Sequence, residues 1–148
     1  MKLETYAFTQ RRKSYYYEFY SEGPNGRIQK VVEFYHLDTA EVMIYNLSFG
    51  DWQNQTGRIN DLSVSNNNDK DKILATVAAI IVAFLKEHPD AVIFAEGSTL
   101  SRTRLYQVSI SRQWHEISPY FKAYGYANNK WEFFQKGINY SAFLFTKK

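Results

Sequence analysis

The sequence contains no cysteine. This absence excludes disulfide bonds, zinc sites built from thiolates and a cysteine nucleophile, and it fits a cytosolic compartment. The three histidines, His36, His88 and His115, lie far apart and show no i, i+4 pairing. We therefore expect no metal site. No glycine-rich phosphate loop is present, so we expect no bound cofactor either.

Long hydrophobic runs are also missing. The longest apolar stretch, residues 78–85, is far shorter than the roughly 20 residues that a membrane-spanning helix needs. Residues 1–5 lack the apolar run of a signal peptide. The sequence therefore predicts a soluble, cytoplasmic protein that does not bind a membrane.

Aromatic residues, in contrast, are abundant. The chain has 12 Tyr, 11 Phe and 3 Trp, and aromatic residues make up 18% of its 148 positions. Disordered chains are poor in aromatic residues, and this length suits one domain rather than two. The sequence therefore predicts a single folded domain over residues 1–148.

The net charge is only +3, but the charged residues are unevenly distributed along the chain. Residues 1–35 carry six basic and four acidic groups, and residues 36–96 carry four basic and nine acidic groups. Residues 97–148 carry eight basic and two acidic groups. The basic last third indicates either an anionic partner such as nucleic acid, or a segment that folds against the acidic middle third.

Strand signals dominate the first fifty residues. Four segments rich in Tyr, Phe, Val and Ile are typical of β-strands: 6–8, 14–21, 27–36 and 41–49. Turn residues separate them, in the basic run 11–13, in the Pro- and Gly-containing segment 22–26, and in residues 37–39. We expect a meander of four antiparallel strands.

A polar loop and a helix follow. The loop covers residues 50–69 and contains a weak edge-strand pattern at 58–64. Apolar side chains then recur with helical period over residues 70–87, before Pro89. Asn68 or Asp69 is placed to cap this helix. The polar run 66–72 predicts either capping or one polar wall of a binding site.

Residues 91–148 are predicted to form a strand, a helix and then three more strands. A continuous apolar run at 91–95 predicts a buried strand, and a second helix is expected over residues 100–117, capped by Ser98 or Thr99. Three strands complete the chain, at 120–126, 131–134 and 140–146. The order ββββ-α-β-α-βββ predicts an α+β fold, a mostly antiparallel sheet with two helices packed on one face.

The start of the second helix carries the clearest chemical pattern. Helix N-termini expose free amides and a positive dipole end, so cations are disfavoured there. The sequence nevertheless places two arginines beside hydroxyl groups and a glycine, which together suit an anion or phosphate site. The predicted anion-binding residues are Gly97, Ser98, Thr99, Ser101, Arg102, Arg104 and Tyr106.

A purely structural interpretation of the same segment is open. Arg102 or Arg104 would then pair with Glu96, Asp69 or Asp71 and pin the helix to the sheet. The aromatic residues at 15–17 and Trp52 leave a similar choice, because they suit either packing within the sheet or stacking on nucleic-acid bases.

Several segments resemble a family of small bacterial proteins of unknown function, found mostly in the Bacteroidetes. The resemblance covers nearly the whole chain and rests on residues 45–51, 65–69 with 72–77, 96–99 with 102–106, 131–134 and 139–143. The resemblance implies no activity. It suggests a gene next to a helix-turn-helix regulator, and hence one half of a toxin–antitoxin pair.

Three classes of function remain. The first is a small interaction or regulatory protein that binds an anion and a protein partner. The second is a ribonuclease-like toxin, for which Arg102, Arg104, Tyr106 and His115 are the catalytic candidates. The third is a non-catalytic nucleic-acid binder. Neither the oligomeric state nor the ligand follows from the sequence.

Overall fold

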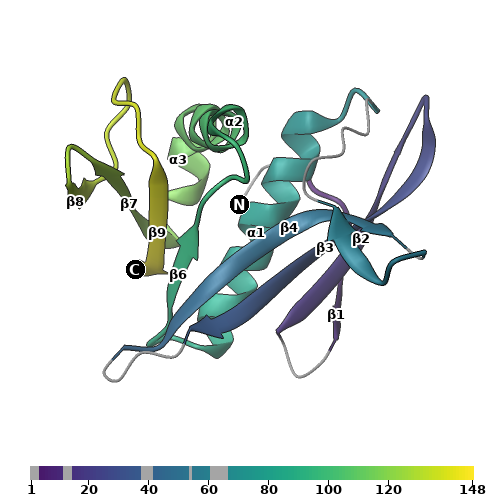
Figure 1. Cartoon of the computed structure of the whole chain (residues 1–148), viewed down its shortest axis with the longest axis horizontal. Helices are drawn as coiled ribbons and strands as arrows, with labels where there is room; N and C mark the ends of the chain where they lie inside the picture. The colour runs from purple at the N-terminus through teal and green to yellow at the C-terminus, as the bar shows by residue number, and fades with distance from the viewer. Residues whose placement is uncertain (1–3, 12–14, 38–41, 54, 61–66) are drawn as a thin grey trace.

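The computed structural model describes residues 4–11, 15–37, 42–53, 55–60 and 67–148. Its described part has the predicted α+β fold, a mostly antiparallel sheet with three helices, two of them long (Figure 1). The predicted turns at 12–13 and 38–39 lie outside these ranges, as do residues 61–64 of the weak edge strand.

The elements follow the predicted order. The strands are β1 (Thr9–Arg11), β2 (Tyr16–Gly23), β3 (Gly26–Leu37), β4 (Ile44–Gln53), β5 (Arg58–Asn60), β6 (Val92–Ala95), β7 (Phe121–Ala127), β8 (Lys130–Phe133) and β9 (Ala142–Lys147). The helices are α1 (Lys70–Glu87), α2 (Leu100–Arg112) and α3 (Trp114–Ile117). Across the sheet the described strands lie in the order β1-β2-β3-β4-β6-β9-β7-β8, and β5 pairs with β4 outside this order.

One strand pair differs from the others in direction. β4 and β6 run parallel, whereas the other strand pairs of the described residues are antiparallel. Their pairing starts at Ile44 and Val92 and ends at Asn46 and Phe94. β4 then continues to Gln53 and curves away from β6 (Figure 1). The sheet therefore divides at the carboxyl ends of two parallel strands, which is a common position for ligands in open sheets.

Both long helices cover the same face of the sheet, as predicted. Phe49 of β4, Ala95 of β6 and Phe143 of β9 line one apolar cavity together with side chains of α1 and α2. α1 has the predicted bounds, and Ile80 and Phe84 on it are fully buried. The broad apolar stripe of α1 thus forms the centre of the core.

β4 extends through Gln53, into the predicted loop 50–69, and two other predicted elements differ more from the structure. The first strand begins at Thr9, after the predicted residues 6–8, because the Tyr6 amide donates to the Thr76 hydroxyl on α1 (2.8 Å) and keeps this segment out of the sheet. As a result Arg11, placed in a turn by the sequence, lies in β1. The predicted helix 100–117 breaks at Gln113, whose buried side chain donates to the Asp71 carbonyl of α1 (3.2 Å) and whose backbone leaves helical angles.

The aromatic segment at 15–17 packs within the protein. Tyr16 and Tyr17 are buried in β2, and the ring of Tyr15 stacks on Tyr45 with centroids 5.7 Å apart. Trp52 is half-buried in β4. These positions favour sheet packing over base stacking.

Candidate functional site

A cleft of about 1070 Å³ lies between the starts of α1 and α2, and Lys30 of β3 and Phe49 of β4 also line it. Residues 67–74 at the start of α1 form one wall. Thr99, Ser101, Arg102, Leu105 and Tyr106 of α2 and its N-cap form the other wall. The starts of both long helices therefore face one space, which we call the interhelix cleft.

The α1 wall is held in place by hydrogen bonds to the β2–β3 hairpin. The Asn67 side chain is 4% exposed, and its amide donates to the Ser21 hydroxyl and the Gly26 carbonyl, each at 3.0 Å. Its carbonyl oxygen accepts from the Asn25 amide at 2.8 Å. Gly23 leaves room for this contact, because a Cβ there would lie 2.5 Å from the Asn67 backbone oxygen.

Asp69 does not cap α1 with its side chain, which corrects one sequence prediction. Its carboxylate instead accepts from the hydroxyls of Tyr6 and Ser21, both at 2.5 Å. Asn68 has a left-handed φ of 57° and does not continue the helix. The first amides of α1 therefore lack an acceptor from the N-cap side chain, so they retain the donor capacity of a helix start.

The same carboxylate changes the acidity of Tyr6. Burial, followed by the hydrogen bond to Asp69, raises the pKa of the Tyr6 phenol above its ordinary value. The ring also lies under the ammonium of Lys72, at 4.2 Å from its centroid. Tyr6 thus stays neutral and fixes the N-terminal segment on the rim of the cleft.

The α2 wall begins with a side-chain cap. The Thr99 hydroxyl accepts a hydrogen bond from the Arg102 amide at 3.1 Å. Thr99 is thus the N-cap, one of the two predicted candidates, and the other candidate, Ser98, is exposed. Thr103 is buried, and its hydroxyl accepts from the Gly97 amide at 3.0 Å. A Cβ on Gly97 would lie 2.4 Å from the Thr103 nitrogen, so glycine permits the tight entry into α2.

The two predicted arginines lie on different surfaces. Arg102 lines the interhelix cleft and is half-buried. The guanidinium of Arg104 donates to the Asn139 side chain at 3.3 Å and lines a separate hollow with Gln107 and Lys136. Of the predicted set, the cleft therefore brings together Thr99, Ser101, Arg102 and Tyr106, and Arg104 lies elsewhere.

Lys30 is a residue of this site that sequence reasoning missed. It lines the cleft although it is only 4% exposed, and its ammonium pairs with the carboxylate of Asp51. The two residues face each other in the β3–β4 register. A lysine two residues before the buried Val32, on the same face of a strand, was the available sequence signal.

Other charges around the cleft are already engaged with each other. Arg112 donates twice to the Asp71 carboxylate, at 2.9 and 3.1 Å. Lys72 lies 3.4 Å from the Glu4 carboxylate. An ion pair between an arginine and Asp71 was predicted and exists, but the arginine is Arg112 of α2 and not Arg102 or Arg104.

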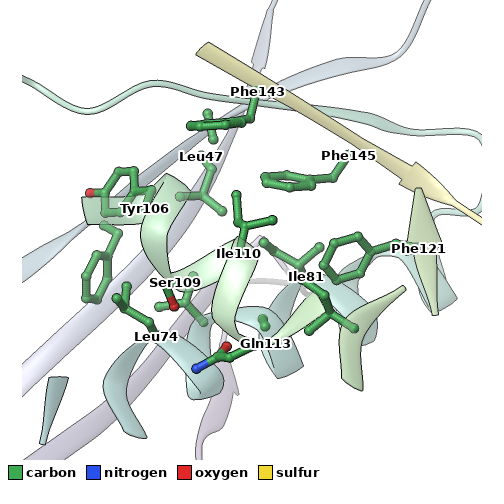
Figure 2. Close-up of a pocket in the computed structure, with 15 residues that line it drawn as sticks. Leu47, Leu74, Ile81, Tyr106, Ser109, Ile110, Gln113, Phe121, Phe143 and Phe145 are labelled. Carbon is green, nitrogen blue, oxygen red and sulfur yellow. The ribbon is translucent and has the colours of Figure 1, made fainter. Parts of the chain in front are cut away.

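A smaller apolar cavity lies behind the interhelix cleft, between α1, α2 and the sheet. It measures about 60 Å³, and Figure 2 shows Leu47, Phe145 and Ile110 around it. Phe49, Leu74 and Tyr106 line both spaces. We call this second space the inner cavity.

One comparison with known proteins gives a match. A family of unknown function, DUF6934, matches residues 2–148. The chain belongs to this family. Neither the curated proteins nor the solved structures include a significant match.

The function of the DUF6934 family is unknown, so the chemistry of the cleft is inferred from its side chains. His115, a catalytic candidate, is exposed on α3 and is not among the described residues that line the cleft. The described residues contain no cluster of His, Asp and Glu that could hold a metal ion. None of the described helices has the length and hydropathy that a membrane crossing demands. Most of the described residues that line the cleft are polar.

Proposed function

We propose that this member of DUF6934 is a small interaction or regulatory protein that binds a phosphate-bearing ligand in the interhelix cleft. The observation that carries the proposal is the convergence of two helix N-termini and the buried Lys30 on one cleft. Helix starts attract anions through free amides and the positive end of the dipole. The Lys30 ammonium, which pairs with the Asp51 carboxylate, lines the same cleft and can donate to an anion there.

The position of Arg102 supports an anionic ligand. It lies in the first turn of α2, a turn without acidic residues, where the dipole disfavours a cation. An anion placed between the guanidinium and the helix start would interact favourably with both. The guanidinium can also hold a phosphate through two parallel hydrogen bonds, and the hydroxyls of Thr99 and Ser101 lie on the same wall.

The charges that line the cleft favour an anion as well. Its described lining contains five basic side chains, from Lys30, Lys70, Lys72, Arg102 and Arg112, and three acidic ones, from Glu4, Asp69 and Asp71. The Asp69 carboxylate accepts two hydroxyl hydrogen bonds, and Asp71 pairs with Arg112. With the Asp51 carboxylate that pairs with Lys30, the cleft has five basic and four acidic side chains, so its formal net charge is +1.

Thermal unfolding in phosphate tests this proposal. A ligand that binds only the folded protein stabilises it by about 2.7 kcal/mol at a hundredfold excess over Kd, which corresponds to a rise in Tm of about 5–10 °C for a chain of this size. Sodium chloride at equal ionic strength is the reference. Arg102→Ala should remove most of the rise.

Arg104→Ala is the matched control. It removes the same side chain from the same helix, but on the surface that faces Asn139. Phosphate also stabilises proteins through exclusion from their surface, and this effect raises the Tm of every variant alike. A specific site therefore requires a smaller response in Arg102→Ala than in Arg104→Ala. Equal responses would refute the cleft as the phosphate site.

The biological setting belongs to the same proposal. A bacterial cytoplasm and a protein partner such as a helix-turn-helix regulator are supported by the resemblance described above and by the cysteine-free composition. In that setting the ligand would act as the signal, and its occupancy of the cleft would control the partner complex.

Nucleic acid is the second candidate ligand, because residues 97–148 carry eight basic and two acidic groups. Backbone phosphates would then occupy the cleft and the surface near Arg104. Binding of labelled RNA and DNA should weaken steeply with salt, by nearly one unit of log–log slope per neutralised phosphate on duplex DNA. No binding at tens of micromolar protein and low salt would exclude this candidate and the toxin together.

A further inference from the structure

We infer that the ligand of the interhelix cleft is an organic phosphate with a short apolar group, and that this group occupies the inner cavity. The inference rests on the proposed function, because the cleft must first hold the phosphate. It adds the chemical class of the ligand. Three features of the structure support it: the contact between the two spaces, the chemistry of the inner cavity and its size.

The two spaces adjoin each other. The side chains of Phe49 on β4, Leu74 on α1 and Tyr106 on α2 line both of them. They therefore form the boundary between the two spaces. In Figure 2 the Tyr106 hydroxyl points away from the apolar side chains of the inner cavity, while its ring borders them. A ligand held beside α2 can therefore extend past these three side chains without crossing a strand.

The chemistry changes along this path. The cleft presents Lys30, Arg102 and the polar residues at both helix starts. The inner cavity is bounded almost entirely by apolar side chains, including Ile81, Phe143 and Phe145. Cavities of this kind stay dry and accept apolar groups. The pair of spaces thus fits a molecule with a charged end and an apolar end.

The volume limits the apolar group. An engineered apolar cavity of about 150 Å³ accepts benzene, which corresponds to about 25 Å³ per carbon. The 60 Å³ inner cavity therefore has room for about two carbons. A chain of two or three carbons fits this space, and a ring does not.

A series of alkyl phosphates measures the effect. The probes are inorganic phosphate and its methyl, ethyl, propyl, butyl and hexyl esters, titrated by calorimetry at constant ionic strength and pH. Burial of one methylene corresponds to about a fourfold gain in affinity. We expect the dissociation constant to fall about fourfold per carbon up to two or three carbons and then to level off.

Two variants separate the inner cavity from the apolar parts of the cleft. Ala78→Leu fills the cavity from α1, and Ser109→Val narrows it from α2, with Ala78 and Ser109 both buried. Either variant should flatten the dependence on chain length while its affinity for inorganic phosphate stays within twofold. Ser109→Val adds less volume, so it tests the inference if Ala78→Leu does not fold.

The outcomes are distinct. A chain-length gain in the parent that both cavity variants lose supports the inference. Phosphate binding with no chain-length gain, or with a gain that the variants keep, overturns the inference and leaves the proposed function intact. If neither phosphate nor any ester binds, the proposed function and the inference both fail.

Discussion

Lys30 and Asp51 form an ion pair on the face of the sheet that the helices cover. They lie opposite each other on β3 and β4, and their side chains are 5% and 15% exposed. A buried pair costs desolvation energy, which Coulomb attraction and hydrogen bonds must offset. Lys30 also lines the interhelix cleft, so its ammonium can donate to a ligand there.

Removal of Asp51 should therefore lower the free energy of unfolding strongly. Asp51→Ala leaves the buried ammonium of Lys30 without its carboxylate, and we expect a loss of about 3–5 kcal/mol in the free energy of unfolding. Replacement of both partners, by Lys30→Met with Asp51→Leu, should cost far less. Urea denaturation of the single and double variants measures this difference. A cost below 1 kcal/mol for Asp51→Ala would show that water in the cleft solvates the ammonium.

Ile81 tests the role of α1 as the centre of the core. The side chain is 5% exposed and borders the inner cavity. Ile81→Ala removes buried carbons and enlarges that cavity, so the free energy of unfolding should fall by about 2–5 kcal/mol. Chemical denaturation provides the value, and a change below 0.5 kcal/mol would mean that the helix is peripheral.

Gly97 tests the entry into α2. A Cβ at this position would lie 2.4 Å from the Thr103 nitrogen and 2.7 Å from the Arg102 Cβ, so the helix start must move. Gly97→Ala should lower the free energy of unfolding by about 1–3 kcal/mol and weaken phosphate binding. Ser98→Ala, at the exposed neighbour, should change stability by less than about 0.5 kcal/mol. Similar effects of the two substitutions would contradict the close packing at Gly97.

Alkaline pH should destabilise the fold. Burial and the hydrogen bond with Tyr15 raise the pKa of Tyr45 to about 12 from an ordinary value of 10. The neutral phenol is favoured in the folded state, so this stabilisation is complete below pH 10 and is lost as the pH rises towards 12. The urea midpoint of the parent should fall as the pH rises from 9 to 12. The midpoint of Tyr45→Phe should fall less steeply over the same range. The same slope in parent and variant would assign the loss to other groups.

The sequence predicts those parts of the fold that depend on local patterns. The bounds of α1 follow from apolar residues at helical spacing together with Pro89 at the end. The strands predicted at 120–126 and 131–134 correspond to β7 and β8, and Asn128 and Asn129 between them adopt the left-handed φ values of 53° and 62° that a tight turn needs. Thr99 caps α2 because a hydroxyl at that position reaches the amide of Arg102.

The parts that depend on distant contacts do not follow from local patterns. Tyr6 lies outside the sheet because Thr76 and Asp69, far along the chain, bind its amide and hydroxyl. Arg102 and Arg104 diverge because residues two apart point to different sides of a helix. Lys30 joins the cleft through a register with Asp51 that only the folded sheet defines.

The most direct measurement of the central claim is a phosphate titration followed by amide chemical shifts in a ¹⁵N-labelled sample. If phosphate binds between the two helix starts, the largest shifts will belong to residues 70–72 and 101–103, and they will saturate with one dissociation constant. Amides of Lys136, Gly137 and Asn139, which line the separate hollow beside the Arg104 side chain, will stay nearly unchanged. Largest shifts at residues 136–139, or small shifts that spread over the whole surface without saturation, would contradict a phosphate site in the interhelix cleft.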